Sequence, residues 1–292
     1  MNLSHHCYPC ILNMALSIAN LSGFDRDQSA LLMDETLHLL LELKKEFAAP
    51  PPVAAKRIFQ KAAEISGAPE AFDPYRPLKK KANDTIMAIY GQLERMIAEK
   101  ESPVETAIRL SALGNILDFA IIDPAKIDIQ REVAAASDLI FEKYDDASFF
   151  SILSRAKHVL IIGDNAGEIL FDKLLAKNLK AFKPGLLVTY AVRHRPILND
   201  VTLEDASDVG MDQVADVISS GSLAPGTCLD ETSLTFNHIF NTADLVISKG
   251  QGNYETLNGV KMESLFFIFR VKCKQVADVM NAPLHSLVLL QA

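Results

Sequence analysis

The sequence predicts an α/β protein in which a three-layer α/β/α domain with a mostly parallel sheet follows an all-helical N-terminal domain. In the first half, long segments carry apolar residues at helical spacing, and no strand is evident. From about residue 156, short apolar runs rich in branched residues alternate with helical patterns. Such alternation is typical of parallel sheets covered on both faces. We therefore expect a helical domain over 1–155 and an α/β domain over 156–292.

Breaker residues at the ends of the periodic segments mark the individual elements. Ser22-Gly23 closes the first helix, prolines 50–52 follow the second, and Ser102-Pro103 supplies an N-cap and a proline to the fifth. The expected helices span 7–21, 31–47, 53–65, 79–100, 102–117 and 128–144. The expected strands span 158–162, 185–192, 214–219, 245–248, 265–271 and 287–290.

Composition excludes several classes of protein. With 292 residues, 49% hydrophobic and 23% charged, the chain can bury a sizeable core. A net charge of −8 argues against a nucleic-acid partner. We find no apolar run of about 18 residues that would cross a membrane, and we expect no signal peptide. Four cysteines are too few for a disulfide scaffold, so we expect a cytoplasmic location.

The turn after the first expected strand, Gly163-Asp164-Asn165-Ala166-Gly167-Glu168, carries hard oxygen ligands. Adjacent Asp and Asn oxygens suit magnesium or manganese, and the N-terminus of the following helix favours anions. The alternative is that Asp164 only caps that helix. In open α/β sheets, ligands bind beyond the carboxyl ends of the strands, where this turn lies.

Two further strand ends could complete such a site. After the second strand, Asp200 could add a third metal ligand, and Arg193 or Arg195 could face phosphate oxygens, although a solvated turn explains them as well. After the strand 245–248, Lys249 precedes a glycine-rich turn that could cradle phosphate through its backbone amides. This turn contains Gly250, Gly252 and Asn253, and it matches neither a Walker A loop nor a dinucleotide-binding motif.

Two motifs lie in the helical half. Asn115 and Asp118 share one helical face and are either a substrate-facing pair or a satisfied core network. The preceding Gly114 costs roughly 1 kcal/mol relative to Ala within a helix, which suggests a close approach to another element. Near the N-terminus, Cys7 and Cys10 form a Cys-x-x-Cys pair that could hold a second metal or act in redox chemistry, or could simply be packed thiols.

Taken together, these motifs resemble the damage-control phosphatase family, also known as domain of unknown function 89. The resemblance rests on residues 163–168, Asn199-Asp200 and residues 249–255, together with residues 114–118. Cys7-Tyr8-Pro9-Cys10 is similar to the stand-alone prokaryotic branch of that family.

The resemblance implies metal-dependent hydrolysis of small phosphomonoesters, such as sugar phosphates or damaged phosphometabolites. It implies metal ligands at Asp164, Asn165 and Asp200, with magnesium, manganese, cobalt or nickel as the divalent ion. Lys249 and the amides of residues 250–253 would bind phosphate, with Asn115 and Asp118 on substrate hydroxyls. Asp164 or Glu168 would transfer a proton, and the sequence does not decide between them.

Two other functions compete with hydrolysis. A carboxyl methyltransferase that uses S-adenosylmethionine would have an open glycine turn where Asp164-Asn165 stands. A non-enzymatic metal- or nucleotide-binding protein would use the helical domain as a partner surface. The partner expected for the favoured function is a small phosphorylated metabolite, and the oligomeric state cannot be read from the sequence.

Overall fold

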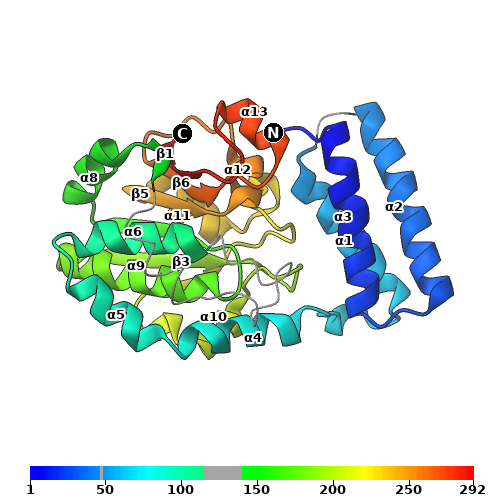
Figure 1. Ribbon diagram of the computed structural model, residues 1–292, viewed down its shortest axis with the longest axis horizontal. Coiled ribbons are helices and arrows are strands. Elements are labelled where there is room, and N and C mark those ends of the chain that lie inside the picture. Colours follow the sequence, from blue (N-terminus) through cyan, green and yellow to red (C-terminus); the bar gives the residue numbers. More distant parts are fainter. Residues whose placement is uncertain (47–48, 115–139) are drawn as a thin grey trace.

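The computed structural model describes residues 1–46, 49–114 and 140–292, and its centre is a seven-stranded sheet (Figure 1). The strand order is β1-β7-β6-β5-β2-β3-β4, and every neighbouring pair is parallel except β6 and β7. The strands are β1 (Phe141–Tyr144), β2 (His158–Ile162), β3 (Leu187–Val192), β4 (Asp216–Ser219), β5 (Leu245–Lys249), β6 (Leu265–Arg270) and β7 (Leu287–Gln291). The prediction of a mostly parallel α/β sheet is confirmed.

Strand β2 shows why these segments form a sheet covered on both faces. Val159 and Ile161 pack into one hydrophobic core, whereas Leu160 and Ile162 pack into the other. Successive side chains of a strand point to opposite faces, so an unbroken apolar run is buried only when helices cover both.

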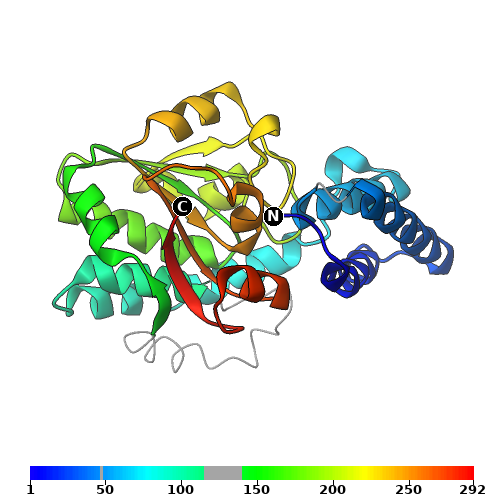
Figure 2. The ribbon, with the colours of Figure 1, turned by 90° about the horizontal axis from the view of Figure 1, so that it is seen from above.

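Helices form a layer on each face of the sheet (Figure 2). One core is shared with α4 (Arg76–Met87), α5 (Tyr90–Ala98), α6 (Pro103–Gly114), α8 (Asp146–Arg155), α9 (Glu168–Phe182) and α10 (Leu203–Asp208). The other core is shared with α11 (Leu234–Thr242), α12 (Gln251–Leu257) and α13 (Lys274–Met280). Short 3-10 turns lie at His5–Cys7, Pro69–Ala71, Met211–Gln213 and Leu229–Glu231.

A separate helical bundle stands beside the sheet, as Figures 1 and 2 show. It consists of α1 (Tyr8–Leu21), α2 (Arg26–Glu46) and α3 (Pro51–Ile65), which share their own core. Ile197, from the loop after β3, is buried in that core and links the bundle to the α/β domain. None of the described helices is long and apolar enough to cross a membrane.

The structure differs from the sequence prediction in two elements. The helix expected over 79–100 is two helices, α4 and α5, separated at residues 88–89. The last part of the helix expected over 128–144 is instead strand β1, which pairs in parallel with β7. Helices α4 to α6 share a core with the sheet, whereas α1 to α3 have a core of their own. The division into domains at residue 155 stays a prediction.

The topology points to one edge of the sheet as a ligand site. Strand β2 lies between β3 and β5, so the chain leaves β2 toward one side and returns later on its other side. Such a reversal opens a crevice at the carboxyl ends of the strands. The ends of β2, β3 and β5 carry the three motifs that the sequence singled out.

Candidate active site

The turn after β2 is held tightly against the turn after β5. The Asp164 carboxylate packs on Gly250, where a Cβ atom would lie 1.9 Å from Asp164 Oδ2. Gly250 also has a φ of +79°, which side chains other than glycine rarely adopt. Asn165 Nδ2 donates a hydrogen bond of 2.6 Å to Asp164 Oδ2. The glycine therefore makes room for Asp164 at this position.

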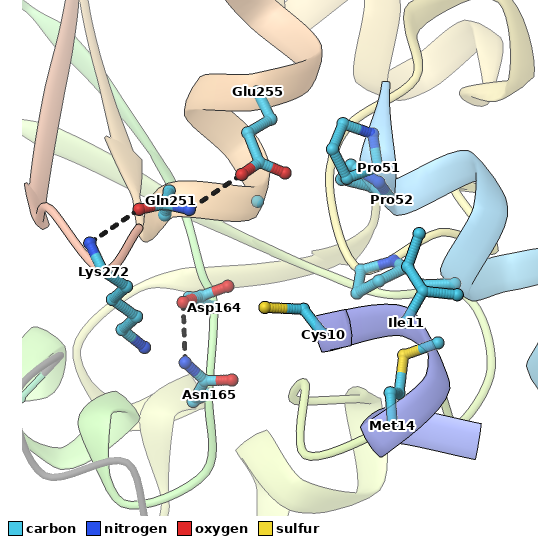
Figure 3. Close-up of a pocket in the computed structure, with 13 residues that line it drawn as sticks. Cys10, Ile11, Met14, Pro51, Pro52, Asp164, Asn165, Gln251, Glu255 and Lys272 are labelled. Carbon is cyan, nitrogen blue, oxygen red and sulfur yellow. Dashed lines mark hydrogen bonds between the residues drawn. The ribbon is translucent and has the colours of Figure 1, made fainter. Parts of the chain in front are cut away.

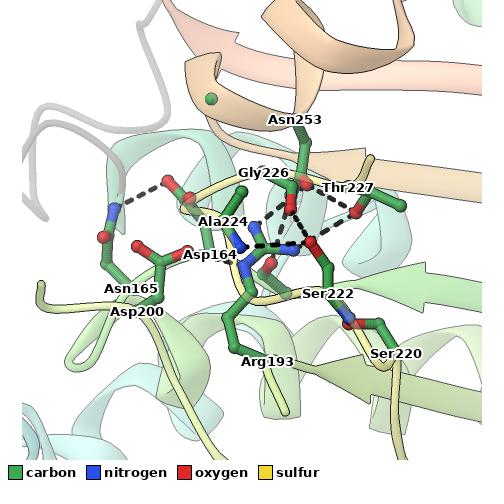
Figure 4. Close-up of polar contacts among 12 residues, drawn as sticks. Asp164, Asn165, Arg193, Asp200, Ser220, Ser222, Ala224, Gly226, Thr227 and Asn253 are labelled. Atoms are coloured by element: carbon green, nitrogen blue, oxygen red, sulfur yellow. Dashed lines mark hydrogen bonds and ion pairs between the residues drawn. The ribbon is translucent and has the colours of Figure 1, made fainter. Parts of the chain in front are cut away.

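The loop after β3 brings Asp200 to the same turn (Figure 4). Asn165 and Asp200 form an isolated antiparallel bridge, and the Val201 amide donates to the Asp164 carbonyl at 2.9 Å. This follows from the parallel pairing of β2 with β3, which places their exit loops side by side. The three predicted metal ligands thus lie together.

The two carboxylates of this group are buried, and burial shifts their titration. Burial and the neighbouring charges of Asp200 and Glu168 raise the pKa of Asp164 well above its usual range. Burial also raises the pKa of Asp200 to about 6, against the opposing effect of Arg193. A cation bound beside these two buried acids would stabilise the ionised form of both carboxylates.

Arg193 is fully buried, and its guanidinium bonds to protein groups (Figure 4). Nε donates to Asp200 Oδ2 at 2.7 Å, and the two terminal nitrogens donate to Thr227 Oγ1 and Asn253 Oδ1. Asn253 in turn donates to the carbonyls of Gly163 and Lys249. Arg193 therefore ties together the exits of β2, β3 and β5. The phosphate contact expected of Arg193 stays a prediction.

The loop after β4, residues 220–227, also reaches this site, and the sequence reasoning missed it. Its side chains and backbone bond to one another, as when Ser222 Oγ donates to the Gly226 carbonyl at 2.8 Å. Thr227 Oγ1 donates to Asn253 Oδ1 at 2.8 Å. The sequence feature that could have indicated this loop is its cluster of Ser, Gly and Pro residues directly after a strand of the parallel sheet.

A pocket of about 250 Å³ opens in front of Asp164 and Asn165 (Figure 3). Its polar side includes Gln251, Glu255 and Lys272. The helical bundle supplies an apolar side through α1 and α3, with Ile11, Met14, Pro51 and Pro52. Both the bundle and the α/β domain therefore contribute walls to the pocket.

The comparisons with known proteins agree with this architecture. A family model described as the damage-control phosphatase ARMT1-like domain matches residues 3–288. The chain belongs to this family. Since the match covers nearly the whole sequence, the bundle and the α/β domain are both part of the family architecture.

Relatives in this family include two archaeal proteins. The chain is 29% identical to the damage-control phosphatase PH1575 of Pyrococcus horikoshii, covering 100% of this chain and 98% of that protein. It is 31% identical to a damage-control phosphatase of Archaeoglobus fulgidus, covering 95% and 94%. The crystal structure of PH1575, described as a DUF89 family protein, superposes with a TM-score of 0.90 over 100% of this chain and 99% of that one.

In this family member, Lys249 lies in a buried ionic network. Its ammonium donates to Glu168 Oε1 at 2.6 Å, to Asp172 Oδ1 at 2.7 Å and to the Ser111 carbonyl at 3.0 Å. An ammonium has three donors, and these contacts use all of them. Tyr190 and Ser111 donate to Asp172 as well. The phosphate contact expected of Lys249 and the proton transfer expected of Glu168 remain predictions.

Other predicted residues have varied positions. Gly252 lines the pocket, and Gly114 makes the expected close approach, since a Cβ there would lie 2.9 Å from the Phe171 ring. Asn115 and Asp118 fall outside the described residues.

The two thiols of the N-terminal motif lie in different surroundings. Cys7 Sγ donates to Gln275 Oε1 at 2.9 Å, whereas Cys10 lines the pocket and points toward Asp164 (Figure 3). Among the described residues, no group of three or more His, Cys, Asp or Glu side chains is arranged to hold a metal. Within the part of the chain that the structure describes, Cys7 and Cys10 therefore have no third side chain of these types placed to complete a second metal site. A metal site at Asp164 and Asp200 would need the amide oxygen of Asn165 as its third ligand.

Helix α4 holds the loops that carry the predicted ligands. Asn83 Oδ1 accepts a hydrogen bond of 2.6 Å from the Gly167 amide, at the end of the Asp164 turn. Lys79 donates a hydrogen bond of 2.9 Å to the carboxylate of Asp205. The same carboxylate accepts from the amide and the hydroxyl of Thr202, which lies two residues after Asp200. Residues of α4 were absent from every motif, so the sequence offered no sign of this role.

Replacing Asn83 with Ala should lower the free energy of unfolding by roughly 1–2 kcal/mol, because the buried Gly167 N–H loses its acceptor. Urea unfolding measures this change. Asn241→Ala is the matched control, since the exposed Asn241 bonds only within its own helix. Equal unfolding midpoints for the two variants would show that the Asn83 contact contributes nothing.

Glu255 should make stability depend on pH. Burial raises its pKa to about 7, partly offset by the hydrogen bond from Gln251. The pKa of Glu255 is higher in the folded protein than in the unfolded chain, so the protonated side chain stabilises the folded state. This stabilisation is complete below the pKa of the unfolded chain and is lost as the pH rises through about 7. From pH 5 to 8, Glu255→Gln should therefore gain roughly 3 kcal/mol of stability relative to the wild type. Urea unfolding across this range tests it, and a constant difference would contradict it.

Proposed function

We propose that this chain is a metal-dependent phosphatase that hydrolyses small phosphomonoesters. The observation that carries the proposal is the convergence of Asp164, Asn165 and Asp200 at the carboxyl ends of β2 and β3. Two of them, Asp164 and Asn165, line a pocket that is also lined by the cationic side chain of Lys272. Membership of the damage-control phosphatase family and the names of its two archaeal relatives support the reaction class.

The residues present fit a hard divalent cation. Two carboxylates and one amide oxygen, without thiol or imidazole, form a donor set suited to magnesium or manganese, and cobalt or nickel could replace them. In our proposal, Asp164, Asn165 and Asp200 hold the ion. A cation bound there would act as a Lewis acid on a phosphoryl oxygen.

Around that ion, the chain's own groups would position the substrate. Lys272 lines the pocket and lies near enough to Asp164 to lower the pKa of that carboxyl, so it can offset charge on the phosphate. Arg193 donates to the Asp200 carboxylate, and Thr227 and Asn253 hold Arg193 by accepting from its terminal nitrogens. We therefore add Lys272 to the phosphate-binding residues predicted from the sequence.

Replacing Lys272 with Met should raise KM for a phosphomonoester about tenfold, because the pocket loses a cation while the stem of the side chain is largely kept. Steady-state assays of phosphate release measure the change. Lys274→Met, at an exposed position on α13, is the control and should match the wild type. Equal KM values for both variants would show that Lys272 does not bind the phosphate.

A screen of purified protein against phosphomonoesters, with magnesium, manganese, cobalt and nickel in turn, tests the function itself. We expect metal-dependent release of phosphate from at least one ester. No release from any ester, together with tight binding of S-adenosylmethionine in the absence of metal, would favour the methyltransferase alternative.

A further inference from the structure

The loop after β3 connects the core of the helical bundle to the predicted metal ligand Asp200. Ile197 is buried in the bundle core, and Leu198 packs against the same core. Asp200 follows two residues later and lies beside Asn165 (Figure 4). One short segment of the α/β domain therefore has its apolar end in the bundle and its acidic end at the candidate site.

The backbone between these two ends forms a tight turn that leucine does not favour. The Asp200 amide donates to the Ile197 carbonyl at 3.1 Å, which closes a four-residue turn with Leu198 as its first central residue. Leu198 has a φ of +49°, which glycine and asparagine adopt far more readily than leucine. A strained residue of this kind persists only where its surroundings hold it in place. For Leu198, those surroundings are the bundle core.

The same turn is joined to the turn after β2 by main-chain hydrogen bonds. The Asn199 carbonyl accepts from the Ala166 amide at 2.9 Å, next to the bond between the Val201 amide and the Asp164 carbonyl. Side chains anchor the turn to the bundle, and the main chain anchors it to the site. A rotation of the backbone at Leu198 would therefore move the adjacent Asn199 carbonyl and, with it, the Asp200 side chain.

We propose that Ile197 and Leu198 are positioning residues through which the helical bundle sets the place of the Asp200 carboxylate. This inference rests on the proposed function, because it concerns one of the same metal ligands. Neither side chain is among the residues that line the pocket in front of Asp164. Their effect is on the geometry of the ligands, and a hard cation requires that geometry to be held within about 0.5 Å.

The test measures the Kd for manganese by isothermal titration calorimetry in the wild type, in Ile197→Ala and in the control Leu32→Ala. Leu32 is fully buried in the same bundle core, so its truncation weakens the bundle in a comparable way, but it is not among the residues that line the pocket. We expect Ile197→Ala to raise the Kd about tenfold, because Asp200 is no longer held, and Leu32→Ala to keep it within about twofold. Urea unfolding shows that each variant is folded.

Leu198→Gly guards against a folding defect in Ile197→Ala, because glycine adopts the positive φ of this turn without strain. It should raise the Kd roughly tenfold as well, whereas Ile197→Val, which keeps most of the buried side chain, should stay within about twofold of the wild type.

The positioning role is overturned if folded Leu198→Gly and Ile197→Ala bind manganese as the wild type does. It is also overturned if Leu32→Ala weakens binding as much as Ile197→Ala, because the contact would then serve only the stability of the bundle. In both cases the metal site and the phosphatase function stand. If the wild type itself binds no manganese, this inference and the proposed metal site fall together.

Discussion

Asp164→Ala should abolish metal-dependent release of phosphate, with a loss of at least about a thousandfold in kcat/KM. Asp164 is at once a predicted metal ligand, the acceptor of the Asn165 amide and the carboxylate against which Gly250 packs. Its removal would leave one carboxylate and one amide in the donor set, too few to hold a hard cation firmly. The measurement is phosphate release at saturating manganese.

Asp212→Ala is the control for this variant, because Asp212 is exposed and is not among the residues that line the pocket. Thermal unfolding of both variants shows that each is folded. If Asp164→Ala is folded and hydrolyses a phosphomonoester at the wild-type rate, Asp164 is not part of the active site.

Gly250→Ala should reduce activity at least a hundredfold while the protein stays folded. The new methyl group would meet Asp164 Oδ2 at 1.9 Å, so either the carboxylate or the turn after β5 must move. A displacement of about 1 Å in a catalytic group is enough to cost roughly a hundredfold. The measurement is kcat/KM for a phosphomonoester, together with the urea midpoint.

Gly185→Ala separates steric displacement from backbone strain. Gly185 has a similar positive φ, +87°, but a Cβ there would have no atom within 4 Å. Both variants should lose about 1 kcal/mol or more of stability from the strained backbone, and only Gly250→Ala should lose activity. Equal activities would show that the approach of Gly250 to Asp164 is unimportant for function.

Much of the fold follows from local patterns in the sequence. The strands that alternate with helices were predictable because they are unbroken apolar runs, as in Val159–Ile162, and such runs need two covered faces. Strand β1 has only four residues, too few to show a period, and it is stabilised by pairing with β7, a contact between distant parts of the chain. The membership of α4 to α6 in the core of the sheet depends on similar long-range packing.

The candidate site was predictable to the extent that it depends on strand ends. Asp164 and Asp200 follow neighbouring parallel strands, so topology alone brings them together. The direction of a long side chain is another matter: Arg193 and Lys249 also follow such strands, yet both turn inward to buried carboxylates. Glu255 and Lys272 belong to the pocket because of how α12 and the loop after β6 pack, which no local spacing reveals.

The most direct test of the central claim is phosphate release by chelator-treated protein before and after manganese is restored. Our account predicts no release without metal, recovery of activity on addition of manganese, and no recovery in Asp200→Asn. Full activity in the chelator, or equal recovery in Asp200→Asn, would contradict a metal site formed by Asp164, Asn165 and Asp200.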